Sequence, residues 1–156
     1  MRAAKIFSAF AAAIILVTSA SAQAEDEQTA DAQPTKKTVK DFAQLAQGIY
    51  TGLVVDCRGL GLKTAASPVI KNINGTKIYG HKDLDIDKII SVGMVDYVND
   101  PEKISRAGSH PLIVKAVALD NFNCNPVVSI EDSNRILMEN YATKFLKELS
   151  VVFLFD

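Results

Sequence analysis

The sequence predicts a small α+β domain in which one mixed β-sheet is covered on one face by helices. Short apolar runs rich in β-branched residues alternate with amphipathic stretches, the mixture typical of this class. An Asn-Gly pair at 74–75 lies between two alternating runs and predicts a β-hairpin. The last part of the chain runs strand, helix, strand, the order of a parallel βαβ unit.

The N-terminus is typical of an exported protein. Arg2 and Lys5 precede an apolar core over 10–17 that is too short to span a bilayer, and a small-residue motif predicts cleavage after Ala24. Residues 25–37 are polar and predict a disordered leader. This leaves 38–156 as the folded domain, a length that suits one hydrophobic core. We expect the product to be secreted, either periplasmic or associated with the cell surface.

Charge and hydropathy limit the classes of partner. Without residues 1–24 the chain carries 15 basic and 18 acidic residues, a net charge of −3. This balance provides no basic surface for nucleic acid, so we predict no nucleic-acid partner. No later apolar run reaches the length of a membrane span, so we predict no transmembrane segment after signal removal.

The first half of the domain predicts two helices around an early strand and a hairpin. Apolar residues recur at helical spacing before Gly48 and again before Gly93, and glycine commonly follows the end of a helix. Strands are predicted where β-branched and aromatic residues gather. The expected elements are a helix over 36–47, a strand over 50–55, a hairpin over 68–79 and a helix over 83–92.

The second half predicts a short helix, a second hairpin and the closing strand–helix–strand unit. Asp100 before Pro101 is typical of a helix start, and Ser129 with Asp132 resembles a capping box. The expected elements are a short helix to about residue 107, strands over 111–119 and 126–130, a helix after 129 and a strand over 150–155.

A glycine-rich loop follows the first strand and is a candidate binding loop through Arg58, Gly59 and Gly61. A dinucleotide fingerprint needs a third small residue where Thr64 stands, so a structural turn is the simpler interpretation. Alternation along the strand places Asp56 and Arg58 on one face, where they can form an ion pair.

A histidine and three aspartates form a candidate metal site: His81, Asp83, Asp85 and Asp87. The aspartates alternate as in a calcium loop, but Lys88 and Met94 occupy the positions where an EF-hand needs glycine and glutamate. Aspartates also favour a helix N-terminus, which explains them without a metal. We therefore assign no metal and no cofactor.

Two cysteines remain after signal removal, Cys57 and Cys124. An oxidising compartment allows them to form a disulfide, although the sequence does not give their separation. No catalytic serine, cysteine or metal-hydrolase motif is present in the sequence. We therefore predict a protein that is not an enzyme.

Several segments carry a family resemblance: Tyr50–Leu62, Ser67-Pro68, Ile78–Gly80, Gly93-Met94, Asn99-Asp100, Pro111–Ala116 and Val151–Asp156. Together they resemble a family of uncharacterised secreted bacterial proteins associated with envelope proteins of the LPP20 type, including the flagellar protein FlgP. The resemblance implies a role in flagellar or outer-membrane assembly. It implies no role for any single residue.

These observations predict a non-enzymatic secreted or periplasmic domain that binds another component of the cell envelope, with an envelope protein as partner. The alternative is a periplasmic protein that binds a small ligand or a metal through the glycine loop or the 81–87 segment. An exposed strand edge can also pair with a second copy, so a homo-oligomer is compatible with the sequence.

Overall fold

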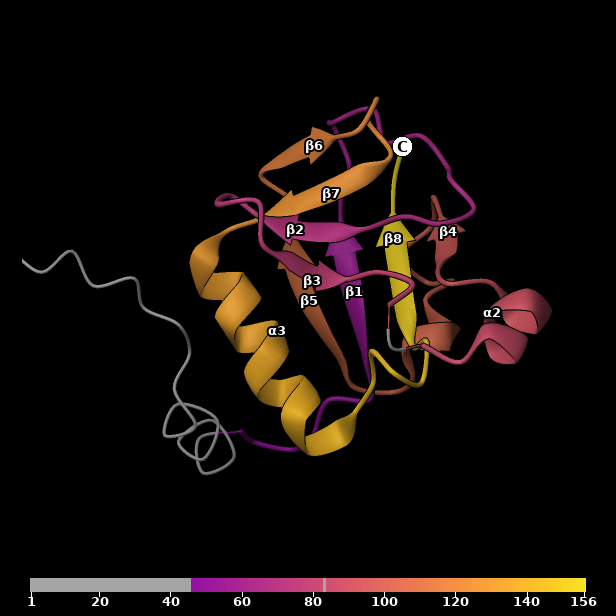
Figure 1. Ribbon diagram of the computed structural model, residues 1–156, viewed down its shortest axis with the longest axis vertical. Coiled ribbons are helices and arrows are strands. Elements are labelled where there is room, and N and C mark those ends of the chain that lie inside the picture. Colours follow the sequence, from indigo (N-terminus) through magenta and orange to yellow (C-terminus); the bar gives the residue numbers. More distant parts are fainter. Residues whose placement is uncertain (1–45, 83) are drawn as a thin grey trace, which may run out of the picture. The chain divides into compact units, whose positions relative to one another are not determined.

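The computed structural model describes residues 46–82 and 84–156 (Figure 1). Within these ranges the chain forms two four-stranded sheets and two α-helices, which confirms the predicted α+β class. The predicted signal peptide, its cleavage after Ala24, the predicted leader and nearly all of the predicted 36–47 helix lie outside the described residues. Ala46 and Gln47, at the end of that helix, have no regular structure.

The first sheet has the order β4-β8-β1-β5 and all its strands are parallel. Its members are β1 (Gly52–Asp56), β4 (Asp96–Val98), β5 (Pro111–Lys115) and β8 (Val151–Leu154). The two central strands are apolar at consecutive positions, because both of their faces are covered.

The second sheet has the order β3-β2-β7-β6 and is mixed. It contains β2 (Ile70–Asn72), β3 (Lys77–Tyr79), β6 (Ala118–Asp120) and β7 (Asn125–Val128). The predicted hairpin at Asn74-Gly75 is confirmed, since β2 and β3 are antiparallel. Gly75 has a φ of 80°, and the Asn72 Oδ1 accepts hydrogen bonds from the backbone of Asn74 and Thr76 at 3.0 Å each.

The prediction of one mixed sheet is wrong in detail, because the strand expected over 111–119 divides between the two sheets. The Ala116 N–H still donates to the Asp56 carbonyl at 2.9 Å, whereas the Val117 N–H donates to the Val127 carbonyl at 2.8 Å. The chain therefore leaves the first sheet and enters the second between two consecutive residues. The predicted hairpin with 126–130 is formed by β6 and β7, which are antiparallel.

The closing βαβ unit is also corrected. The strand, helix and strand form where expected, with α3 (Ile130–Thr143) between β7 and β8, and the Ser129 Oγ accepts a hydrogen bond from the Asp132 N–H at 3.0 Å. However, β7 belongs to the second sheet and β8 to the first, so the two strands are not neighbours. Sequence order alone does not determine which sheet a strand joins.

The main core lies between the two sheets and α3 (Figure 1). Leu53 and Val55 of β1 and Phe153 of β8 face this core, together with Ile136 of α3. The opposite face of the first sheet is covered by a smaller cluster that includes Ala107 of the 3-10 helix η1 (Ser105–Ala107). The prediction of helices on one face thus holds for α3, while η1 replaces the short helix expected up to residue 107.

Arg106 connects three parts of this fold that are distant in sequence. Its guanidinium donates to the carbonyls of Leu149 at 2.7 Å, Val92 at 2.9 Å and Gly93 at 2.6 Å, and its Nη1 also contacts the Asp96 carboxylate at 2.7 Å. The side chain is only 14% exposed. A planar fork of donors satisfies all four acceptors at once, which a lysine ammonium does not.

We therefore expect Arg106→Lys to lower the free energy of unfolding by about 2–3 kcal/mol. Urea denaturation measures this loss. Arg135→Lys is the matched control, because Arg135 is exposed and its one hydrogen bond to a described residue is to the Tyr50 hydroxyl, whose ring it also overlies. Equal denaturation midpoints for the two variants would contradict the role given to Arg106.

Candidate ligand cleft between β3 and α3

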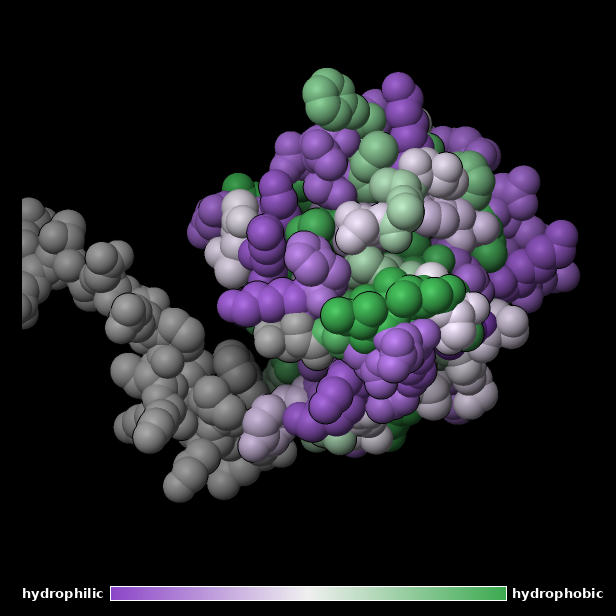
Figure 2. Space-filling view, turned by 45° about the vertical axis from the view of Figure 1, so that its right-hand side comes forward, coloured by the Kyte–Doolittle hydropathy of each residue, from purple (hydrophilic) through white to green (hydrophobic). Residues whose placement is uncertain are grey.

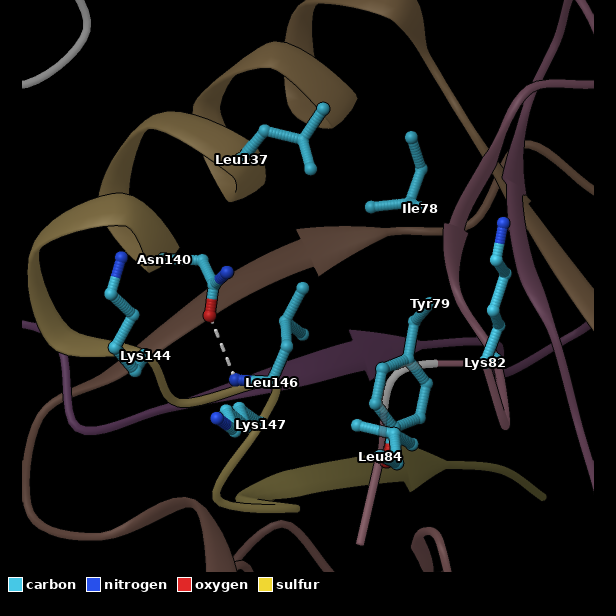
Figure 3. Close-up of a pocket in the computed structure, with 10 residues that line it drawn as sticks. Ile78, Tyr79, Lys82, Leu84, Leu137, Asn140, Lys144, Leu146 and Lys147 are labelled. Atoms are coloured by element: carbon cyan, nitrogen blue, oxygen red, sulfur yellow. Dashed lines mark hydrogen bonds between the residues drawn. The ribbon is translucent and has the colours of Figure 1, made fainter. Parts of the chain in front are cut away.

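A cleft of about 320 Å³ opens between β3 and the C-terminal half of α3 (Figure 3). Its volume lies at the lower end of the range for small-molecule sites. Figure 3 shows Leu137 and Ile78 on opposite sides, with Lys82 on one side and Lys144 and Lys147 on the other. The lining residues are Ile78, Tyr79, Gly80, Lys82, Leu84, Leu137, Asn140, Lys144, Leu146 and Lys147.

The end of α3 explains why residues after the helix reach the cleft. Lys144 adopts a left-handed conformation with a φ of 60°, and its N–H donates to the Asn140 carbonyl at 2.8 Å. The Asn140 Oδ1 then accepts a hydrogen bond from the Leu146 N–H at 2.9 Å. This turn reverses the chain, so that Leu146 is buried in the floor and Lys147 remains on the rim.

The floor of the cleft is apolar and fixed. Ile78, Tyr79 and Leu146 are buried, while Leu137 is 39% exposed. The Tyr79 hydroxyl donates to the Met94 carbonyl at 2.6 Å, and burial raises the pKa of this phenol to about 12. Tyr79 therefore remains neutral at physiological pH and holds the wall in place, without acting as an acid or base.

The rim is cationic. Lys82, Lys144 and Lys147 are exposed or half-exposed, and none of them forms an ion pair with another residue in the described ranges. No carboxylate is among the lining residues, although Asp83 lies outside the described residues. The nearby Lys88, in contrast, pairs with Glu148 at 2.6 Å. The Lys144 Nζ lies over the Tyr141 ring, 4.4 Å from its centroid. Three ammonium groups with no carboxylate partner among the described residues, beside apolar side chains, favour an anionic ligand with an apolar part.

An exposed apolar surface lies on the helix that follows the cleft residue Leu84 in the chain. The predicted 83–92 helix forms as α2 (Ile86–Val92), which begins two residues after Leu84 of the cleft wall. The expected burial of its apolar face is wrong: Ile86 is 69% exposed and Ile90 is 78% exposed. Figure 2, with this side turned forward, shows hydrophobic surface bounded by hydrophilic residues. Such a surface is typical of an interaction site.

The glycine loop of Arg58, Gly59 and Gly61 lies outside the cleft and forms a turn. Gly59 and Gly61 have φ values of 79° and 71°. The Gly59 N–H donates to the Asp156 carboxylate at 2.8 Å, so this donor is already used within the chain. Arg58, in the turn after β1, binds Asp56 through two nitrogens at 2.9 and 2.7 Å, which lowers the pKa of that carboxyl and confirms the expected ion pair.

The candidate metal residues do not come together in the described part of the chain. The Asp85 carboxylate accepts a hydrogen bond from the Lys88 N–H at 3.2 Å and caps α2, which confirms the helix-start interpretation for this residue. His81 and Asp87 are exposed. Among the described residues, which leave out Asp83, no three His, Cys, Asp or Glu side chains are placed to hold a metal ion.

Both cysteines are free thiols in the structure, so the candidate disulfide between Cys57 and Cys124 is not formed in it. Cys57 follows β1 and is fully buried, whereas Cys124 is partly exposed in the loop between β6 and β7. Burial, together with the nearby Asp56 charge, raises the pKa of the Cys57 thiol to about 12. Cys57 is therefore a structural residue and a poor nucleophile.

This pKa predicts a loss of stability at alkaline pH. Between about pH 9 and pH 12 the unfolded chain releases the Cys57 proton while the folded chain retains it. The unfolded state is then favoured as pH rises, by at most about 1.4 kcal/mol per pH unit. Free energies of unfolding at pH 8, 9 and 10 should fall more steeply for the wild type and Cys124→Ala than for Cys57→Ala. Parallel slopes for all three proteins would contradict the assignment.

The described part of the chain matches a family model over residues 52–156, from the first residue of β1 to the last residue of the sequence. The family is described as the second domain of Tp0624 from Treponema pallidum. The chain belongs to this family. Both walls of the cleft lie inside the matched range, so the cleft is part of the family domain. None of the curated proteins compared with the chain matches it.

Among the described residues of this Tp0624-type domain, no helix combines the length and the apolar character needed to cross a membrane. The resemblance to LPP20-type envelope proteins stays a prediction, as do export and the absence of catalysis.

Reasoning from the sequence did not find the cleft. Its three lysines are separated by up to 65 positions and follow no motif. One signal was available: Lys144 and Lys147 lie near the end of the predicted helix, where cations are favoured. This placement explains the two lysines electrostatically and does not reveal that Lys82 of another segment lines the opposite side of the same cleft.

Proposed function

We propose that this protein is a non-enzymatic extracytoplasmic domain that binds another component of the cell envelope through the cleft between β3 and α3. The observation that carries the proposal is a cleft lined by apolar side chains together with Lys82 on one side and Lys144 and Lys147 on the other. The signal-peptide pattern of residues 1–24 supports an envelope location. The exposed isoleucines of α2, a helix that begins two residues after Leu84 of the cleft, also suit a protein partner.

The cleft also supports the alternative of a small ligand, because its volume and chemistry suit a small amphiphilic anion. No observation favours a metal. Within the first proposal, the resemblance to LPP20-type proteins supports a role in flagellar or outer-membrane assembly.

A cross-linked pull-down from the native envelope fraction tests the proposal. Tagged wild type should recover a reproducible partner, and the charge-reversed variant K82E/K144E/K147E should lose at least nine-tenths of it, because each contact with an anionic partner becomes repulsive. The matched control K63E/K103E/K115E makes the same change in net charge at exposed lysines outside the cleft. Equal losses from both variants would show a nonspecific charge effect and sink the proposal. A partner that is neither flagellar nor of the LPP20 type would remove the assembly role alone.

A further inference from the structure

We propose that the cleft binds a monocarboxylate that carries an unbranched apolar chain of about eight carbons. This inference rests on the proposed function, since it assigns a ligand class to the same cleft. Three properties of the site lead to it: its size, the charge around its rim and the position of the α3 terminus.

The size limits the ligand. A group of the size of water occupies about 30 Å³, so the cleft of about 320 Å³ holds roughly ten non-hydrogen atoms. An eight-carbon carboxylate has this number of atoms. Its chain would lie on Ile78, Leu137 and Leu146, whose side chains form the apolar floor.

The rim selects the headgroup. Lys82, Lys144 and Lys147 supply positive charge, and the Asn140 amide nitrogen makes no hydrogen bond with a described residue. This nitrogen and the lysine ammonium groups are donors of the kind that a carboxylate uses. A neutral headgroup would gain none of the Coulomb attraction of this rim.

The residues that line the cleft favour a carboxylate over a phosphate. Phosphate sites commonly use helix N-termini or arginine forks, and the lining includes neither. The part of α3 that lines the cleft is its C-terminal end, with Asn140 in the last turn and Lys144 at the C-cap. A phosphate therefore meets none of the donor arrangements that usually hold it.

Titration of the ¹⁵N-labelled chain, from Glu25 to Asp156, with octanoate tests the inference. Saturable shifts should appear at the amides of cleft residues, with a Kd on the order of 1 mM for a ligand of this size. Acetate lacks the chain, octyl glucoside lacks the charge and octyl phosphate replaces the carboxylate with a phosphate. Each of these three should bind at least tenfold more weakly than octanoate.

Protein variants test separately the binding of the carboxylate and the binding of the apolar chain. K144E/K147E should weaken octanoate binding at least tenfold, whereas K144R/K147R should retain it because the charge remains. Leu137→Asp should weaken binding by a similar factor, since it places a carboxylate beside the chain and removes an exposed apolar contact. The same variants should leave the spectrum away from the cleft unchanged, which shows that they fold.

Any one of three results would overturn the inference. These are an absence of saturable shifts, shifts centred outside the cleft, and tighter binding of octyl phosphate or octyl glucoside than of octanoate. If the lysine-dependent pull-down still succeeds in that case, the proposed function stands and only the ligand class fails. If the pull-down also shows no dependence on the cleft lysines, both proposals fail.

Discussion

Gly52→Ala should destabilise the domain by at least about 3 kcal/mol, enough to remove a large share of the stability of a domain of this size. Gly52 is buried at the start of β1, in the centre of the parallel sheet. A Cβ at this position would lie 2.5 Å from the Ala107 carbonyl oxygen and 2.6 Å from both the Ala107 Cα and the Ser150 carbonyl oxygen. All three atoms belong to the backbone, so no side chain can rotate away.

The measurement is urea denaturation followed by circular dichroism, with soluble yield as a second readout. Gly59→Ala is the control, because Gly59 has a positive φ but a Cβ added there would meet no atom within 4 Å. It should cost about 1 kcal/mol from backbone strain alone. A Gly52→Ala protein with the midpoint of the wild type would contradict the close packing of η1 on β1.

Phe153→Ala should lower the free energy of unfolding by about 3–5 kcal/mol. Phe153 is fully buried in β8, between β1 and β4, and faces the main core. Its ring meets Tyr97 edge-on, with centroids 5.6 Å apart and planes at 86°. Removal of the ring leaves a cavity in the main core, on the face of the first sheet that meets the second sheet and α3. The strand β8 cannot move in to fill this cavity, because it is paired with a strand on each side.

Phe155→Ala is the matched control for Phe153→Ala. Phe155 also meets the Tyr97 ring edge-on, at 6.3 Å, but it is only partly buried and lies beyond the end of β8. Loss of the Phe155 ring should lower the free energy of unfolding by about 1–2 kcal/mol, because Phe155 removes less apolar area from water on folding than Phe153 does. Denaturation midpoints rank the two variants, and a Phe155→Ala protein as unstable as Phe153→Ala would contradict the placement of the core.

Local patterns predicted most of the strands and the capped helix well, since turn chemistry and capping act within a few residues. Asn74-Gly75 and Ser129 are examples where the expected and observed contacts agree. Pairing between distant strands was predicted poorly. Val151 to Leu154 could join either sheet by composition, and only the parallel register beside β1 and β4 places it in the first.

Glu139 shows a second limit of periodicity. Its helical position predicts a solvent-facing residue, yet it is only 2% exposed. Its carboxylate accepts hydrogen bonds from the Gln47 and Gly48 N–H groups at 3.1 and 3.2 Å. The partner segment lies over 90 residues away, so no local pattern could indicate that this carboxylate is buried and satisfied.

The candidate site was missed for the same reason. Each lysine of the cleft is ordinary in its own segment, and the cleft exists only because the turn after α3 faces β3. The residues that the sequence singled out as functional, Arg58 and Gly59, are instead used in contacts within the chain. Motifs of reactive residues were therefore a poor guide to the candidate site. It is formed by lysines and apolar residues from segments that are far apart in the sequence.

Site-specific photo-crosslinking in the native envelope tests most directly whether the cleft is the binding surface. A photoreactive residue replaces Leu137 on the cleft wall, or Ile113, which is 58% exposed on the outer edge strand β5. We expect an adduct from position 137 that disappears when K82E/K144E/K147E is combined with it, and no adduct from position 113. An adduct from position 113 alone, or one from position 137 that survives the lysine changes, would contradict this expectation.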